Sequence, residues 1–182
     1  TLGNKNMKTL LRIFTVCFLL LPLIQAEEKV QDKKQEIITL PIAKSVPRLD
    51  SLRSSVSKAS GDSIDSGPSS ALYYTGDYFL AVGYRMPKVT HLVYMRAANS
   101  IQFAKAYKER DREKMVLVKI EVKEIKKLLS RHAADSTGAK LIWTSIGDNH
   151  WQRSDGSLAK YEVEKKILMI ATEKQAKKIV GF

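Results

Sequence analysis

Cysteine is almost absent from this chain of 182 residues, which contains a single copy, Cys17. That residue lies in an apolar N-terminal segment, Met7 to Ala26, which we expect to be removed as a secretory signal. The rest of the chain then has no thiol, which excludes disulfide bonds, a cysteine nucleophile and a cysteine-ligated zinc site. The alternative role for Cys17 is lipid attachment, which requires cleavage immediately before it.

The common catalytic and nucleotide-binding motifs are also missing. The chain has no glycine-rich phosphate loop, dinucleotide fingerprint, nucleophile elbow or HExxH helix. Its three histidines, His91, His132 and His150, are far apart in sequence, so we predict no metal site. His132 follows Arg131 in a basic helix, and we expect it to be solvated.

The most site-like cluster surrounds His150, which lies between Asn149 and Trp151 with Asp148 nearby. A turn of this composition presents an imidazole, a carboxylate and an indole together, as a general-base or sugar-stacking site does. The alternative is an ordinary turn, because Asp and Asn are common turn residues and an aromatic side chain after a turn often anchors a hairpin.

Aromatic residues are missing between Glu27 and Leu72, where serine, glycine and proline are frequent. Such a composition predicts a serine-rich flexible segment or linker over 27–70. Residues 1–6 precede Met7 and are interpreted as upstream sequence. The folded domain is expected over 71–182, a length that suits a single modest core.

Among the features that are present, the N-terminal segment is the most distinctive. Lys8 and Arg12 precede an apolar run, Ile13–Leu21, and Pro22 and Ala26 follow it. This order is typical of a signal peptide, and the run is too short to span a bilayer. The sequence therefore predicts a secreted or periplasmic protein with no transmembrane segment after signal removal.

Basic residues outnumber acidic ones, and the formal net charge is +12. Such an excess favours anionic partners, either an anionic surface or an acidic polymer. Nucleic acid is disfavoured as a partner because the chain is expected to be exported. One basic stripe is predicted on the helix Lys123–Ala133 (Lys123, Lys126, Lys127, Arg131), and a second near the C-terminus (Lys174, Lys177, Lys178). The sequence leaves the oligomeric state open.

The hydrophobic pattern predicts a single small α+β domain, mainly an antiparallel sheet with three to four helices. Ala71–Met86 fits a helix, although its tyrosine-rich composition also fits strands. The other expected helices are one capped by Ser100, one over Lys123–Ala133, and a last one, Glu173–Val180, opened by a capping box of Thr172 and Gln175. The expected strands are Val89–Met95, Met115–Val122, Lys140–Ile146, His150–Arg153 and a long strand Leu158–Ala171.

Four short segments resemble conserved parts of one enzyme family. They are Tyr74-Thr75-Gly76 with Tyr78 and Arg85, Val93-Tyr94-Met95-Arg96, Trp143-Thr144-Ser145, and Glu162-Val163-Glu164 followed by Lys165-Lys166-Ile167-Leu168. Together they are similar to the first helix, the arginine strand, the Ser-Thr-Ser strand and the Glu-x-Glu turn of toxin-type mono-ADP-ribosyltransferases.

The resemblance implies NAD as cofactor and a protein as acceptor. It implies that Glu164 and Glu162 are catalytic: Glu164 would hold the ribose and Glu162 would orient the acceptor. It also implies that Arg96, Ser145 and Tyr74 bind the cofactor, with Arg96 on its phosphates. A carboxylate beside the ribose would stabilise the oxocarbenium-like charge that develops when NAD is cleaved.

Three functions follow as hypotheses. The leading one is NAD-dependent mono-ADP-ribosyl transfer to a protein by an exported basic domain. The second is a non-catalytic envelope or polyanion-binding protein, as the charge excess indicates. The third is a secreted basic nuclease that uses His150 with Glu162 and an arginine.

Overall fold

The computed structural model describes residues 39–179, and it separates residues 1–37 from residues 38–182 as two units. The expected signal segment 7–26, the upstream residues 1–6 and residues 27–38 of the expected linker lie outside the described residues. Within the described part, the structure is a small α+β domain, as the hydrophobic pattern predicts. None of the helices described has the length and apolar character needed to cross a bilayer.

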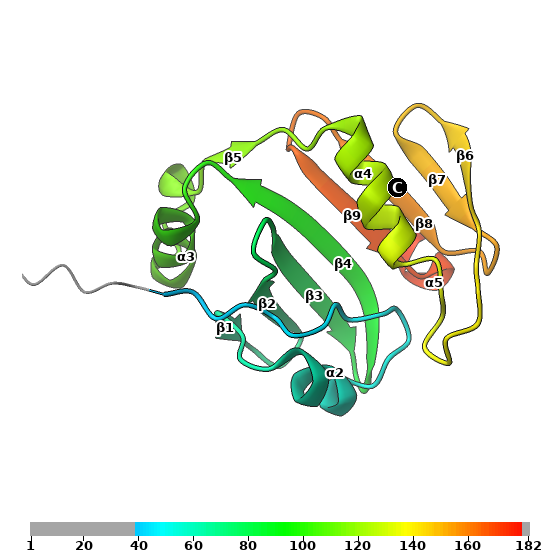
Figure 1. The fold of residues 1–182 in the computed structure, drawn as a ribbon, viewed down its shortest axis with the longest axis horizontal. Helices are drawn as coiled ribbons and strands as arrows, with labels where there is room; N and C mark the ends of the chain where they lie inside the picture. The colour runs from blue at the N-terminus through cyan, green and yellow to red at the C-terminus, as the bar shows by residue number, and fades with distance from the viewer. Residues whose placement is uncertain (1–38, 180–182) are drawn as a thin grey trace, which may run out of the picture. The chain divides into compact units, whose positions relative to one another are not determined.

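An antiparallel sheet of nine strands forms the centre of this domain (Figure 1). Its main order is β1-β2-β3-β4-β9-β8-β7-β6, and the short β5 pairs with β4 outside this path. The strands are β1 Asp65–Ser66, β2 Ser70–Tyr74, β3 Phe79–Arg85, β4 Lys88–Ala97, β5 Leu117–Val118, β6 Trp143–Gly147, β7 His150–Arg153, β8 Leu158–Glu162 and β9 Ile167–Ala171. The two hairpin runs, β1–β4 and β6–β9, therefore meet at the β4–β9 pair.

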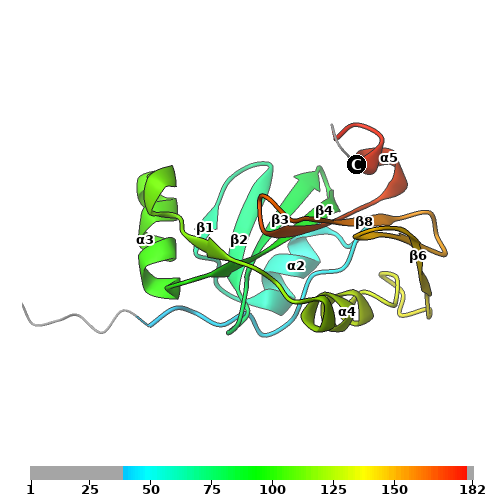
Figure 2. The ribbon, with the colours of Figure 1, turned by 90° about the horizontal axis from the view of Figure 1, so that it is seen from above.

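The helices cover the sheet unequally. They are α2 Arg53–Ser60, α3 Ser100–Glu109, α4 Val122–Arg131 and α5 Glu173–Ala176, with a 3-10 turn at Arg112–Lys114. Helices α2 and α4 lie on the same side of the sheet, and α3 lies near its β1–β2 end (Figure 2). The larger apolar cluster joins the strands to α2 and α4, and a smaller one packs Phe79 and Leu72 against Phe103 of α3.

Helix α4 forms where its sequence is most clearly amphipathic. Ile125, Leu128 and Leu129 follow helical spacing and are buried. A capping box starts the helix, since the Glu121 side chain accepts from the N3 backbone and the Glu124 side chain accepts from Glu121 N at 2.8 Å. The helix predicted over Lys123–Ala133 is thus confirmed, with its observed bounds one and two residues earlier.

The helix expected over Ala71–Met86 is wrong, and the strand alternative is confirmed. This segment forms β2 and β3, joined by a turn at Gly76 with φ 91°. Both faces of β3 are buried, because Phe79 packs toward α3 while Leu80 and Val82 pack toward α4. A strand covered on both sides lacks the apolar and polar alternation that identifies strands in a sequence.

The expected linker 27–70 is corrected for residues 39–70, which are part of the folded domain. Helix α2 lies in this segment, and Val56 on that helix is buried with Leu49 just before it. Arg53 also donates hydrogen bonds to the carbonyl oxygens of Gly67 (2.7 Å) and Pro68 (2.5 Å). Aliphatic side chains therefore anchor the segment where aromatic ones are missing.

Two expected strands are shorter than predicted. The long strand Leu158–Ala171 is divided into β8 and β9 by a turn in which Lys166 has φ 58°. The strand expected over Met115–Val122 is reduced to β5, which pairs with Arg96 and Ala97. The chain then turns inward at the fully buried Ile120 and enters α4.

Two expected helix caps also differ. Asn99, not Ser100, caps α3, and its side chain accepts from Gln102 N at 3.0 Å. Helix α5 is shorter than the predicted Glu173–Val180, and Thr172 at its start makes no side-chain cap hydrogen bond. At α3 the amide oxygen of Asn99 thus takes the role expected of the Ser100 hydroxyl.

One buried arginine joins α4 to the C-terminal hairpins. Arg153 is only 2% exposed, and it donates to both carboxylate oxygens of Asp155 at 2.9 and 2.6 Å. It also donates to the carbonyl oxygen of His132, the residue that ends α4, at 2.8 Å, and to the Ser157 hydroxyl at 3.2 Å. Its guanidinium lies 5.5 Å from the centre of the Trp143 ring. A charge buried this deeply is stable only while these partners remain.

Replacing this side chain tests that dependence. We expect Arg153→Met to lower the free energy of unfolding by about 3–5 kcal/mol, because Asp155 and the His132 carbonyl would lose their partner. Urea unfolding measures the change. Arg112→Met, at an exposed position, is the control and should shift stability by less than about 0.5 kcal/mol. A loss of under about 1 kcal/mol in Arg153→Met would contradict the assigned role.

Candidate functional site

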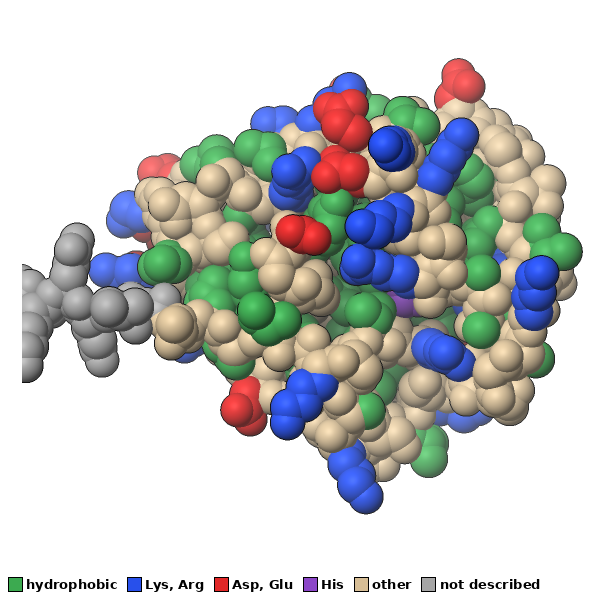
Figure 3. Space-filling view, in the orientation of Figure 1, with side chains coloured by type: hydrophobic (Ala, Val, Ile, Leu, Met, Phe, Trp, Pro, Cys, Tyr) green, Lys and Arg blue, Asp and Glu red, His purple; other side chains and the backbone are tan. Residues whose placement is uncertain are grey.

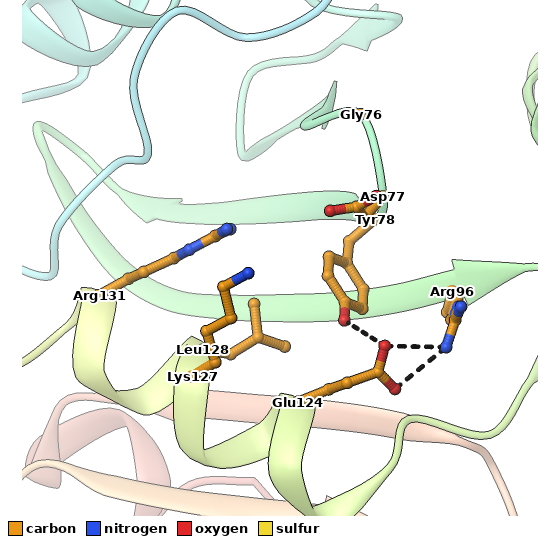
Figure 4. Close-up of a pocket in the computed structure, with 8 residues that line it drawn as sticks. All are labelled: Gly76, Asp77, Tyr78, Arg96, Glu124, Lys127, Leu128 and Arg131. Atoms are coloured by element: carbon orange, nitrogen blue, oxygen red, sulfur yellow. Dashed lines mark hydrogen bonds and ion pairs between the residues drawn. The ribbon is translucent and has the colours of Figure 1, made fainter.

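A pocket of about 310 Å³ lies between α4 and the turn that joins β2 to β3 (Figure 4). Its lining is mostly charged and polar, and consists of Gly76, Asp77, Tyr78, Arg96, Glu124, Lys127, Leu128 and Arg131. These residues come from three separate parts of the chain: the β2–β3 turn, the end of β4, and one side of α4. We call this cavity the α4 pocket.

The local folds that position the lining are simple. Gly76 turns the chain after β2 at a positive φ, which suits glycine. Thr75 closes this turn, since its backbone N–H donates to the Tyr78 carbonyl at 2.8 Å. Arg96 shares the α4 side of the sheet with Tyr94, because alternate residues of a strand point to the same face.

Glu124 connects two other side chains that line the α4 pocket by hydrogen bonds. Its carboxylate accepts from the Tyr78 hydroxyl at 3.0 Å and from Arg96 Nη1 at 2.9 and 3.0 Å. The backbone N–H of Glu121, together with Tyr78 and Arg96, holds the pKa of Glu124 below its ordinary value although partial burial opposes this. Burial and the neighbouring Glu124 carboxylate raise the pKa of Tyr78 to about 12. Glu124 is therefore ionised and Tyr78 is a neutral donor at neutral pH.

Two cations remain without an anion. Lys127 and Arg131 are one helical turn apart on α4, and both extend toward the turn that carries Gly76 and Asp77 (Figure 4). Within residues 39–179, neither side chain makes an ion pair or a hydrogen bond. The α4 pocket therefore offers free donors to an anion. Of its two acidic groups, Glu124 is already bound by Tyr78 and Arg96, and Asp77 forms no ion pair with either cation within residues 39–179.

A buried neutral histidine lies at the end of the same helix. His132 is fully buried, and its Nε2 is 2.7 Å from the Tyr94 hydroxyl. Burial, with the nearby Arg153, Arg131 and Arg48, lowers its pKa to about 3. The expectation that His132 is solvated is therefore wrong: it ends α4 inside the core, so its ring adds no charge to the cations around it.

The residues predicted from the enzyme resemblance lie at several places. Tyr74 and Glu162 are on the face of the sheet opposite to α4, since their strand neighbours Tyr73 and Tyr161 face α4. Tyr74 packs against Phe79 and donates to the Gly76 carbonyl oxygen. Glu162 forms an ion pair with Lys165 at 2.6 Å.

The other three residues do not share a cavity. Arg96 lines the α4 pocket, whereas Ser145 lines a different hollow and its hydroxyl donates to the Gly147 carbonyl at 3.3 Å. Four strand spacings separate β4 from β6, which is about 19 Å laterally. Glu164 is exposed in the β8–β9 turn. These residues do not form one cleft for NAD, so ADP-ribosyl transfer stays a prediction without support from this arrangement.

The cluster around His150 is a turn between β6 and β7. His150 Nδ1 lies 2.7 Å from the Asp148 carbonyl oxygen, and Asn149 has φ 57°. Trp151 faces the α4 side of the sheet and His150 the opposite side, because they are adjacent on β7. Both residues nevertheless line a hollow of about 320 Å³, whose other lining residues, Ile146, Gly147, Leu158 and Ala159, supply no carboxylate. Among the described residues, no group of three or more His, Asp or Glu side chains could hold a metal ion.

Sequence reasoning identified Arg96 and the basic stripe on α4 but missed Glu124 and the role of Tyr78. A local signal for Glu124 exists, since Glu121 and Glu124 have capping-box spacing just before the apolar run of α4. No local signal exists for its partners, because Tyr78 is 46 residues away and Arg96 is 28 residues away.

The low pKa of His132 makes stability depend on pH in a defined window. The unfolded chain binds a proton at His132 below about pH 6.5, and the folded chain does not, so acidification favours unfolding. We expect wild type to lose up to about 1.4 kcal/mol per pH unit more than His132→Gln between about pH 6 and 5. Urea unfolding at several pH values measures this. Parallel stability curves for the two proteins would contradict the neutral buried state.

Comparison with other proteins adds nothing to this description of the site. No protein-family model, no curated protein and no solved structure matches the chain. The function therefore has to be argued from the charges and the geometry of the described residues.

Proposed function

We propose that this chain is a non-catalytic binding module whose α4 side engages an anionic polymer or surface. The ligand groups would be phosphate, sulfate or carboxylate groups carried at intervals along the polymer. One observation carries the proposal: the four exposed cations of α4, Lys123, Lys126, Lys127 and Arg131, make no ion pair within residues 39–179. Unpaired cations on one helix attract an extended anion more strongly than the same charges spread apart.

The neighbouring acidic groups within residues 39–179 form no ion pair with these four cations, and Asp77 at the α4 pocket adds one negative charge against their four positive ones. Glu124 is bound to Arg96 and Tyr78, and Asp135 holds its own turn by accepting from Thr137 and Ala139. On α3, by contrast, Lys105 lies 3.9 Å from Glu109, and just after α5 Lys177 lies 2.6 Å from Glu173. Among the helices described, α4 thus carries the largest group of exposed cations without an ion pair.

The positive surface extends beyond the helix. Arg48 donates to the backbone carbonyl of Asp135 at 3.0 Å, which leaves its charge unbalanced, and it is close enough to lower the pKa of His132. Figure 3 shows lysine and arginine side chains gathered over α4 and continuing below it. A row of this kind suits a linear polyanion, with Lys127 and Arg131 at the α4 pocket as the points of closest approach.

Export is a part of the same proposal. The segment 7–26 has the order of a signal peptide, which supports a site of action in the periplasm or outside the cell. An acidic polymer of a cell envelope or an extracellular matrix is then the kind of anion that the protein would meet. Exposed lysine and arginine side chains, which need no reducing environment or cofactor, suit binding in that compartment.

Heparin affinity tests the proposal. We expect the full chain to bind heparin and not neutral dextran, with an affinity that falls steeply as the NaCl concentration rises. Lys127→Gln/Arg131→Gln should bind about thirtyfold more weakly, from about 1 kcal/mol per cation at an anionic surface. Fluorescence anisotropy with labelled heparin measures both effects.

The matched control is Lys105→Gln/Lys108→Gln, which removes the same charge from α3 at the far end of the domain. It should weaken heparin binding by less than about threefold, because remote charges are screened. Equal losses in the two double variants would show that only net charge matters, and would overturn the assignment to α4. Binding that does not respond to salt would also overturn it.

A further inference from the structure

A second, apolar hollow lies on the other side of α4. It has a volume of about 580 Å³ and lies between the helix and the β6–β7 hairpin. Helical periodicity explains the separation, because Lys126, Leu129 and Ala133 line this hollow while Lys127, Leu128 and Arg131 line the α4 pocket. We call it the tryptophan groove, because Trp143 and Trp151 form much of its strand side.

The lining of the tryptophan groove is unusually apolar for an open surface. Leu129 of α4 and Leu141 of the loop before β6 contribute to it, and both indoles are half-buried along the sheet. Ile142 at its margin is 64% exposed, although an isoleucine is commonly buried in a folded domain. Concave apolar surface of about this size, in the range of roughly 300–1,000 Å³, is typical of sites for small molecules.

Buried neighbours hold the two indoles of the groove in position. The Arg153 guanidinium lies 5.5 Å from the centre of the Trp143 ring, and Arg153 is itself held by Asp155 and by the end of α4. Trp151 packs against the main apolar cluster. Two indoles fixed by buried neighbours lose little conformational entropy on binding, which favours a preformed site.

The charged residues that line the tryptophan groove are both basic. Lys126 from α4 and Lys140 from the loop before β6 both line it, and both are exposed. Neither makes an ion pair within residues 39–179, and none of the described residues that line the groove is acidic. An occupant that matches this lining has an apolar body and an anionic end.

We propose that the tryptophan groove binds a single-chain anionic amphiphile, such as a long-chain fatty acid. Its hydrocarbon chain would lie against Trp143, Trp151 and Ile142, and its acid group would pair with Lys126 and Lys140. A polymer of charged sugars or phosphates has no apolar body to fill the groove, so this occupant differs from a polyanion bound at Lys127 and Arg131, although Lys126 borders both places. The proposal does not depend on that function.

The chain carries its own probe for this site. It contains two tryptophans, and both line the groove. We expect dodecanoate, titrated into the full chain below its micellar concentration, to shift the tryptophan emission to shorter wavelength in a saturable way as water leaves the indoles. Dodecanol, which has the same chain length and no charge, should bind about tenfold more weakly, since two exposed ion pairs contribute about 1–2 kcal/mol together.

Two variants separate the parts of the proposal. Lys126→Gln/Lys140→Gln should weaken dodecanoate binding about tenfold and leave dodecanol binding unchanged, while Lys105→Gln/Lys108→Gln should change neither. Ala133→Phe should fill the groove and abolish both signals, and an unchanged urea midpoint would show that it is folded. If Ala133→Phe unfolds, Ile142→Ser at the exposed margin replaces it, and should weaken both ligands.

Several results would overturn the proposal. These are the absence of a saturable shift below the micellar concentration, equal affinity for dodecanoate and dodecanol, and full binding by a folded Ala133→Phe protein. A response to phospholipid vesicles alone would instead identify a membrane surface as the partner. Heparin binding is measured separately, so its failure would leave the dodecanoate result unaffected.

Discussion

The buried guanidinium of Arg153 is the interaction on which this side of the domain depends. It satisfies the carbonyl at the end of α4, binds Asp155 in the β7–β8 turn and lies beneath the Trp143 ring. One side chain thus connects the end of the helix to the C-terminal hairpins, beside the apolar contacts of Leu128 and Leu129. Both cavities described above are bounded by α4, so loss of the partners of this buried charge would disturb the helix that forms a wall of each.

Helix α4 separates a charged pocket on one of its sides from an apolar groove on the other. One side of α4 presents Lys127 and Arg131 beside a carboxylate that other groups already bind, and the next side presents Leu129 and Ala133 to two indoles. The neutral state of His132 at the helix end belongs to the same arrangement, because a charged imidazole there would repel the nearby arginines. The domain therefore presents unpaired positive charge on the exposed side of α4 and keeps the buried charge of Arg153 paired with Asp155.

The parts of this structure that could be predicted from sequence are those with local causes. Helix α4 follows from the spacing of Ile125, Leu128 and Leu129, and the antiparallel α+β class follows from the order of elements. The β2–β3 hairpin was predicted ambiguously because its residues are buried on both faces. Glu124 was missed because its partners, Tyr78 and Arg96, become its neighbours only after distant segments pack together.

A feature on the opposite face of the sheet has a separate consequence. Gly83 pairs in register with His91, and a methyl group at Gly83 would lie 1.9 Å from Cε1 of that imidazole. The ring therefore occupies the volume that any other residue would need. A side chain at position 83 therefore requires a smaller residue at its cross-strand neighbour 91, whereas His91 needs the glycine opposite it to keep its place.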